Sequence, residues 1–146
     1  MELTRDFREL LKLLNENKVE YLVVGGYAVI IYGYPRLTID IDIWINPVNV
    51  NAEKVIKTIK DFGFSFDNLT EEDFRKSDNV IQLGRPPYRV DILTSIEGMD
   101  FNKCYKRKYI YIKDDLIINF ISRKDLIENK KNVGRNKDLD DVSNLT

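Results

Sequence analysis

The chain has 146 residues, of which 43% are hydrophobic and 32% charged, and its 23 basic and 24 acidic side chains give a net charge of −1. This length predicts one compact domain covering residues 1–146. The balanced charge argues against a protein that binds nucleic acid through an overall positive charge. With no histidine and a single cysteine, Cys104, the composition excludes a disulfide framework and Ser-His-Asp or Cys-His catalysis, and it leaves little basis for a structural zinc site.

The first 35 residues predict a helix, a strand and a second helix. The N-terminus is charged and no apolar run approaches 18 residues, so we expect no signal peptide, no membrane span and a cytoplasmic protein. Apolar residues spaced i, i+3, i+4 and i+7 predict a helix over residues 4–15. The run YLVV predicts a buried strand, closed by Gly25 and Gly26. A short helix over YAVIIYG should end at Gly33 and Pro35.

The stretch RLTIDIDIWI, residues 36–45, predicts a second strand with two different faces. Successive side chains of a strand point to opposite sides. We therefore expect one face to carry isoleucines toward the core and the other to carry polar groups. The expected core face consists of Ile39, Ile41, Ile43 and Ile45, and the expected site face of Thr38, Asp40, Asp42 and Trp44.

The middle of the chain alternates helical and strand patterns. Residues 46–64 predict an amphipathic helix capped by Asn49 or Asn51 and ended by Gly63, with Ala52, Val55, Ile56 and Ile59 on its apolar face. Residues 67–78 predict a polar surface loop with a short helical turn. Residues 79–93 predict a hairpin around GRPP, followed by a possible short helix near 99–105, a strand over 108–113 and a short run LIINF, residues 116–120.

The chain should end in a helical segment, residues 122–146. Ser122 followed by Asp125 indicates a helix start, with an apolar side formed by Leu126, Ile127 and Val133; Leu139, Val142 and Leu145 predict a last helix. The order of elements favours an α/β or α+β fold, with a mixed sheet of four to five strands and helices packed on it.

Asp40 and Asp42 are unusual in an isoleucine-rich strand. Aspartate is depleted from strands, and an ionised carboxylate away from water is costly unless it is paired or bound to a metal. The two carboxylates should project from one face, roughly 6.5–7 Å apart at Cα. Mg²⁺ is held by one or two carboxylates plus substrate phosphates. A divalent metal site is therefore one interpretation, and a solvated strand face is the other.

Asp91 is a third carboxylate inside an apolar strand. If its strand lies beside residues 36–45 with Asp91 on the same face, three carboxylates converge. The alternative is that Asp91 only forms an ion pair with Arg89 or Arg36.

The glycine pair and several cations suggest a phosphate site. Between a strand and a helix, the amides of Gly25 and Gly26 can approach a phosphate, although a tight turn is the more common reason for such a pair. Arg36 and Thr38 add a guanidinium and a hydroxyl suited to a triphosphate. Further along, Lys130, Lys131, Arg135 and Lys137 form a basic cluster, which composition alone assigns to a solvated helix surface.

Taken together, V-G-G, a gap of 13 residues, D-I-D-I and a later strand aspartate resemble the nucleotidyltransferase superfamily, which includes DNA polymerase beta and the minimal nucleotidyltransferases. The segment GGYAVIIYGYPRLTIDIDIWI is similar to that of the AbiEii-like toxin and related bacterial and archaeal nucleotidyltransferases. The tail LIENKKNVGRNKDLDDVSNL is similar to the segment that closes many of those proteins. The resemblance extends from about Tyr21 to Leu145.

The resemblance implies roles for individual residues. Asp40 and Asp42 would bind two Mg²⁺ ions, with Mn²⁺ as a substitute, and Asp91 would complete the site and help deprotonate the acceptor. Gly25 and Gly26 would hold nucleotide phosphates. Lys130, Arg135 and Lys137 match the basic residues of the closing segment and are counted among the nucleotide-binding residues; Asp138 and Asp141 match its acids.

These features predict a Mg²⁺-dependent nucleotidyltransferase. It would transfer a nucleoside monophosphate from an NTP such as ATP to a hydroxyl of an RNA, a protein or a small molecule, releasing pyrophosphate. A second copy or an antitoxin partner would complete the acceptor site. One alternative is a nucleotide-binding regulatory protein, such as half of a toxin–antitoxin pair. The other is a metal-dependent glycosyltransferase, for which the chain is short.

Overall fold

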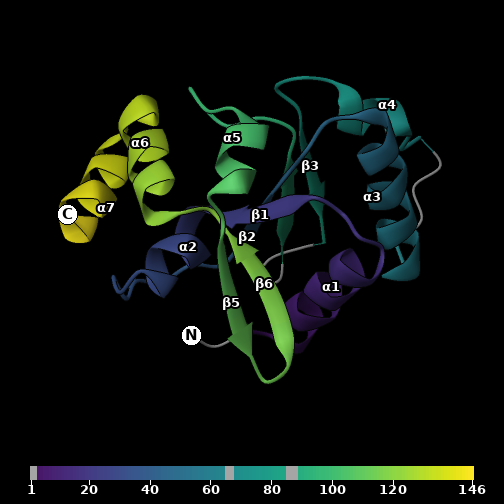
Figure 1. Ribbon diagram of the computed structural model, residues 1–146, viewed down its shortest axis with the longest axis horizontal. Coiled ribbons are helices and arrows are strands. Elements are labelled where there is room, and N and C mark those ends of the chain that lie inside the picture. The colour runs from purple at the N-terminus through teal and green to yellow at the C-terminus, as the bar shows by residue number, and fades with distance from the viewer. Residues whose placement is uncertain (1–2, 65–67, 85–88) are drawn as a thin grey trace.

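The computed structural model describes residues 3–64, 68–84 and 89–146, which form helices packed on a twisted mixed sheet (Figure 1). The helices are α1 (Arg5–Glu16), α2 (Gly25–Ile31), α3 (Asn49–Asp61), α4 (Glu71–Arg75), α5 (Phe101–Lys106), α6 (Arg123–Val133) and α7 (Asn136–Leu145). The strands are β1 (Tyr21–Val24), β2 (Ile41–Ile45), β3 (Val80–Leu83), β4 (Val90–Leu93), β5 (Tyr109–Lys113) and β6 (Leu116–Phe120).

The strands within the described ranges form one sheet in the order β3-β4-β2-β1-β6-β5. β2 is antiparallel to β1 and parallel to β4, and β3–β4 and β5–β6 are antiparallel hairpins. The mixed sheet and the hairpin at 79–93 confirm the predicted fold class. The sheet has six strands, one more than the upper expectation. The GRPP turn lies mostly in residues 85–88, outside the described part.

The two faces of β2 differ from the simple alternation expected for residues 36–45. Ile41, Ile43 and Ile45 are buried, as predicted. Ile39 is 51% exposed, so its assignment to the core was wrong: the strand begins only at Ile41. Trp44, on the opposite face, is fully buried because Phe101 of α5 packs edge-on against its ring at 5.1 Å between centroids. Both faces of the sheet are therefore covered at this point.

The helix signals predicted α1 more accurately than the start of α3. Thr4 caps α1 by accepting a hydrogen bond from the Phe7 amide. α3 begins after Val48, whose side chain makes no cap. Asn51 is buried instead and accepts a hydrogen bond from the Glu20 amide at 2.7 Å. The predicted cap at Asn49 or Asn51 is therefore wrong. An asparagine that has a distant backbone partner is not available to a helix end.

The C-terminal segment is helical, as predicted, and its buried side is only partly the expected apolar one: Leu126 and Leu145 are buried, as predicted. Ser122 caps α6, and Gly134 ends it in the left-handed conformation. Val133 and Leu139 are exposed, whereas Asp138 and Asp141 are buried. α6 and α7 therefore contact the rest of the protein partly through charged groups. Within the described ranges, no helix is long and apolar enough to cross a membrane.

Candidate active site

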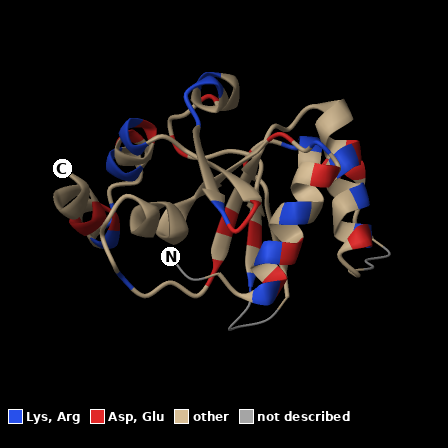
Figure 2. Ribbon diagram, turned by 60° about the horizontal axis from the view of Figure 1, so that its bottom comes forward, with Lys and Arg blue, Asp and Glu red and all other residues tan. Residues whose placement is uncertain are grey.

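Asp42 and Asp91 are neighbours on adjacent strands. The parallel register of β2 and β4 pairs the two residues directly, which puts their side chains on the same face of the sheet. The acids of these central strands appear in red in Figure 2. Asp40 lies just before β2 and is half-buried. The register thus brings together the three carboxylates that the sequence singled out.

Arg89 lies between two of these acids. Its Nη2 is 2.6 Å from Oδ2 of Asp40, and its Nε is 3.2 Å from Oδ1 of Asp91. The second contact is close enough for an ion pair but poorly aligned, so Oδ1 of Asp91 is buried without a hydrogen bond. The alternative in which Asp91 pairs with Arg89 is therefore observed, and pairing with Arg36 is not.

The electrostatics of the acids reflect burial and mutual repulsion. Burial, together with the negative charges of Asp91 and Asp40, raises the pKa of Asp42 to about 7, although Lys130 and Lys137 act in the opposite direction. Burial also raises the pKa of Asp91, which Arg89 opposes. Asp42 is the carboxylate that gains most from a cation placed beside it.

The donor set is compatible with Mg²⁺ if Arg89 moves. Among the side chains in the described ranges, no three acidic, cysteine or histidine groups are arranged to hold one ion. Arg89 instead supplies the positive charge between Asp40 and Asp91. Asp42 together with the unbonded Oδ1 of Asp91 still offers two carboxylates, and Mg²⁺ needs no more than this when phosphates supply the remaining ligands.

The glycine pair packs against the acidic segment. Gly25 has a φ of +65°, and a Cβ there would lie 2.1 Å from Oδ2 of Asp42. A Cβ on Gly26 would lie 2.5 Å from Oγ1 of Thr38. The positive φ supports the tight-turn interpretation of Gly25. The lack of space shows in addition that both positions require glycine for the close approach of α2 to residues 38–42.

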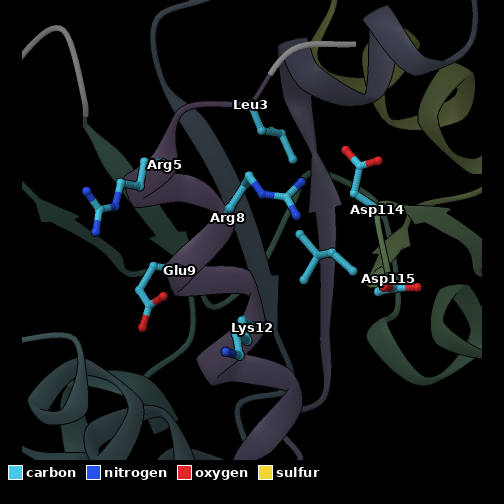
Figure 3. A pocket seen from close by; sticks show the side chains of 8 residues that line it. Leu3, Arg5, Arg8, Glu9, Lys12, Asp114 and Asp115 are labelled. Carbon is cyan, nitrogen blue, oxygen red and sulfur yellow. The ribbon is translucent and has the colours of Figure 1, made fainter.

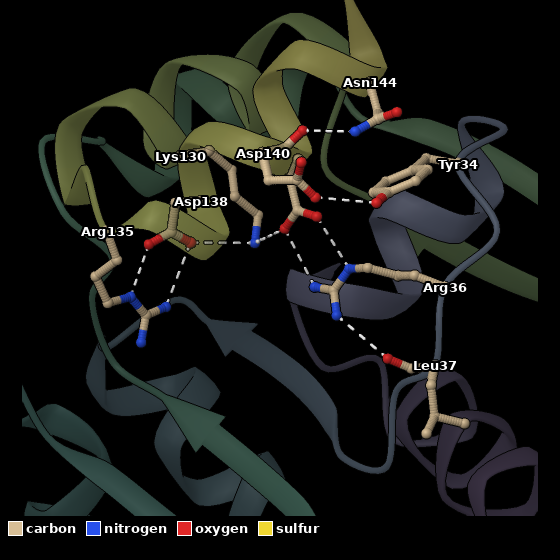
Figure 4. A network of polar contacts seen from close by, with 9 residues as sticks. Tyr34, Arg36, Leu37, Lys130, Arg135, Asp138, Asp140 and Asn144 are labelled. Atoms are coloured by element: carbon tan, nitrogen blue, oxygen red, sulfur yellow. Dashed lines mark hydrogen bonds and ion pairs between the residues drawn. The ribbon is translucent and has the colours of Figure 1, made fainter.

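A network of buried ion pairs joins α6 and α7 to the segment before β2 (Figure 4). Lys130 is buried, with Nζ 3.0 Å from Asp141 and 3.4 Å from Asp138. Arg36 contacts Asp141 at 3.0 Å, and Arg135 contacts Asp138 at 2.7 Å. The solvated-surface interpretation is therefore wrong for Lys130. Arg36, Lys130 and Arg135 each have a carboxylate partner within the protein.

A cavity of about 300 Å³ collects most of the expected site residues. It is lined by Gly25, Gly26, Arg36, Asp42, Lys130, Arg135, Lys137 and Asp138, together with Val24, Leu93, Ser95, Ile96, Glu97, Asn129 and Val133. Thr38, Asp40 and Asp91 are not part of this lining. Residues 95–97 and Asn129 were missed, because no motif in the sequence distinguishes them from ordinary loop and helix residues.

A larger hollow lies elsewhere and lacks these groups. It measures about 590 Å³ and lies between α1 and the β5–β6 turn (Figure 3). Its charged lining consists of Arg5, Arg8, Glu9, Lys12, Asp114 and Asp115. The smaller cavity is the better candidate because a buried acid, a glycine pair and several cations converge there.

The sheet and its helices have the fold of solved structures described as nucleotidyltransferases or nucleotidyltransferase-like proteins. TM1012 of Thermotoga maritima, described as a candidate nucleotidyltransferase, has 18% identity and a TM-score of 0.65 over 96% of this chain and 89% of its own. The lincosamide antibiotic adenylyltransferase LnuA, with lincomycin bound, has 21% identity and a TM-score of 0.63 over 99% and 98%.

An antigenic nucleotidyltransferase-like protein of Paracoccidioides brasiliensis gives 18% identity and a TM-score of 0.57 over 98% of this chain and 77% of its own. No protein-family model matches the sequence, and no curated protein is similar to it in sequence. The chain is therefore similar in fold to nucleotidyltransferases along nearly its whole length.

Proposed function

We propose that the protein is a nucleotidyltransferase that transfers a nucleoside monophosphate from an NTP to an acceptor hydroxyl. The observation that carries this proposal is the direct pairing of Asp42 and Asp91 on adjacent strands beside the glycine pair. Asp42 also lines the cavity that Lys130, Arg135 and Lys137 surround. Carboxylates beside a cationic cavity suit a reaction in which phosphate charge must be neutralised.

The cations of the cavity would bind the triphosphate. Lys137 is exposed and lowers the pKa of Asp42 through space, so its positive charge reaches the site. Arg36, Lys130 and Arg135 are held by Asp138 and Asp141, which fixes their positions. Gly25 and Gly26 would let the phosphates approach the backbone closely. Thr38, behind Gly26, would support that turn.

Asp40, Asp42 and Asp91 would hold one or two Mg²⁺ ions, with Mn²⁺ as a substitute. When bound, the metal supplies charge neutralisation at the phosphates and lowers the pKa of the acceptor hydroxyl. Arg89 would leave Asp40 and Asp91 to make room. In the transfer, the acceptor oxygen bonds to the α-phosphorus and the bond from that phosphorus to the bridging oxygen breaks. Asp91 accepts the hydroxyl proton, and pyrophosphate leaves.

The acceptor is an RNA, a protein or a small molecule, and we place the reaction in the cytoplasm, where NTPs are abundant. The similarity in fold to LnuA, an antibiotic adenylyltransferase, supports including hydroxylated small molecules and ATP among the substrates to test. An antitoxin or a second copy of the chain would complete the acceptor side of the site.

A second candidate function is nucleotide binding without transfer, as in a regulatory protein. The contacts of Arg89 favour it, because a guanidinium that already neutralises Asp40 and Asp91 competes with a catalytic metal. The two functions differ in one measurable outcome, which is the covalent transfer of the α-phosphate.

The test is incubation of the purified protein with Mg²⁺, each α-labelled NTP and a cell lysate, followed by separation of RNA, protein and small molecules. We expect label on one class with the wild type and none with Asp42→Asn. Glu53→Gln, an exposed acid on α3, is the matched control and should retain full transfer. No label with the wild type, or equal label with Asp42→Asn, would contradict catalysis. Nucleotide binding without label would support the regulatory function.

A further inference from the structure

β5 is an end strand of the sheet, and its outer edge has no partner in the described part of the chain. β5 pairs with β6, and no further strand follows in the sheet order. In Figure 1 the β5–β6 hairpin lies at the front, with no helix over the side that faces the viewer. Unpaired strand edges attract a further strand, and proteins usually block them with proline, charge or a bulge.

The register of the hairpin determines which backbone groups reach that edge. The loop has two residues, Asp114 and Asp115, both with positive φ, so Lys113 and Leu116 form the closing hydrogen-bonded pair. Bonding then alternates, so Tyr111 and Tyr109 bond to β6. The amides and carbonyls of Ile110 and Ile112 therefore point away from β6, to the open edge.

Two contacts of β6 agree with this alternation. The carbonyl of Ile117, which lies opposite Ile112, accepts a hydrogen bond from Nδ2 of Asn15. The amide of Asn119, which lies opposite Ile110, donates a hydrogen bond to the hydroxyl of Tyr21. Both backbone groups therefore point away from β5, as they must when these are the non-hydrogen-bonded pairs.

The edge carries apolar side chains rather than blocking ones. Ile110 is 52% exposed and Ile112 65%, and Ile117 beside them on β6 is 46% exposed. No proline or charged residue interrupts residues 109–112. Three isoleucines thus form an uncovered stripe next to four unpaired backbone groups. By contrast, the opposite face of the hairpin contributes Leu116, Ile118 and Phe120 to the core.

We propose that β5 of one molecule pairs antiparallel with β5 of a second copy, which joins the two sheets into one across a twofold axis at Tyr111. The two exposed isoleucines, Ile110 and Ile112, are placed symmetrically on either side of that residue. In this register Ile110 of each copy lies opposite Ile112 of the other, and each pair exchanges two backbone hydrogen bonds. A twofold interface of this kind closes on itself and forms a dimer rather than a filament.

The charges at the two ends select this register over its neighbours. Beyond the strand ends, Lys108, just before β5 of one copy, would lie near Asp114, the first loop residue of the other, so opposite charges flank the isoleucines on both sides. A shift of the axis to Ile110 puts Ile112 opposite Lys108, and a shift to Ile112 puts Ile110 opposite Asp114. Exposed ion pairs contribute little affinity but discriminate between registers. Burial of the isoleucines supplies the attraction.

The first test is sedimentation equilibrium of the purified chain over a series of concentrations. We expect a wild-type mass twice the 17.2 kDa of the chain, and a monomer for the double variant Ile110→Lys, Ile112→Lys. Val80→Lys is the matched control: Val80 is 50% exposed on β3, the strand at the other end of the sheet, and its variant should remain dimeric. Circular dichroism should show that all variants are folded. A monomeric wild type, or a dimer that persists in the double variant, would overturn the proposal.

The second test measures the register. The two copies of Tyr111 would form a non-hydrogen-bonded pair with Cα atoms about 4.5 Å apart, which is within the range of a disulfide. Tyr111→Cys should therefore form a covalent dimer under mild oxidation, seen by mass spectrometry under non-reducing conditions. Tyr109→Cys would face Lys113 rather than itself and should remain uncrosslinked, and the native Cys104 is buried in both variants. Equal crosslinking of the two variants, or crosslinking only of Tyr109→Cys, would contradict this register.

Discussion

Arg36 and Asp141 are 105 positions apart in the chain, yet Nε of Arg36 lies 3.0 Å from Oδ1 of Asp141 and Nη2 lies 3.2 Å from Oδ2. The same carboxylate contacts Lys130, and its side chain is 1% exposed. This contact ties α7 to the segment that leads into the acids of β2. The C-terminal helices therefore help to shape the site, although Asp40, Asp42 and Asp91 lie more than 40 positions before Asp141 in the chain.

Asp141→Asn should destabilise the protein strongly, because Arg36 and Lys130 would lose the buried negative charge that both of them contact. Removing one partner of a buried ion pair typically costs about 3–5 kcal/mol in the free energy of unfolding. Urea denaturation measures the change. Asp61→Asn is the control, since Asp61 pairs with Lys57 at 2.8 Å on the surface and this variant should lose far less stability. Equal losses in the two variants would contradict a special role for Asp141.

Gly25→Ala should impair both folding and nucleotide transfer. The positive φ alone costs roughly 1–2 kcal/mol for an alanine, and the new methyl group would also collide with Asp42. Gly63→Ala separates the two effects, because Gly63 has a φ of +102° and nothing within 4 Å of its added Cβ. We expect a larger loss of stability for Gly25→Ala, measured by thermal and urea unfolding. Similar losses would show that Asp42 moves aside without cost.

Arg89→Gln should increase the stabilisation that Mg²⁺ confers. Without the guanidinium, Asp40 and Asp91 repel each other and Asp42 more strongly, so the metal-free protein should melt at a lower temperature. Mg²⁺ would then replace the missing charge without displacing an arginine. The measurement is the melting temperature with Mg²⁺ and with a chelator, compared with Arg75→Gln, which loses only the surface pairs with Glu71 and Glu72 on α4. An identical Mg²⁺ effect in all three proteins would argue against competition between Arg89 and the metal.

Asp125 should make stability depend on acid pH. Burial alone would raise its pKa, but hydrogen bonding with Arg107, at 2.9 and 3.0 Å, and with Ser122 lowers the pKa below its ordinary value. A carboxyl with a lower pKa in the folded state stabilises that state fully above its unfolded pKa of about 3.9, and the contribution is lost as the pH falls through the folded value.

The free energy of unfolding of Asp125→Asn should therefore be lower than that of the wild type at neutral pH, and the difference should shrink below about pH 4. Chemical denaturation at a series of pH values measures this. A difference that is constant with pH would mean that the ion pair contributes nothing beyond packing.

Local patterns predicted the elements because they depend on short-range physics. The i, i+3, i+4 spacing that predicted α1, the glycine pair after β1 and the hairpin at 79–93 are each decided within a few residues. The buried isoleucines of β2 also follow from strand alternation, except at Ile39, where the strand has not yet begun.

The sequence by itself determined most of the element order and the mixed sheet, and it singled out Asp40, Asp42 and Asp91, because periodicity and spacing express these directly. The register of β2 and β4 then decided that Asp42 and Asp91 meet. The tertiary structure decided which charged side chains form ion pairs: Arg89 pairs with Asp40 and Asp91, and Arg36 pairs with Asp141. Partners so far apart along the chain leave no periodic signal, and their pairing depends on how the helices pack against the sheet. For the same reason, only the sheet order showed that the isoleucines of β5 lie at an open edge.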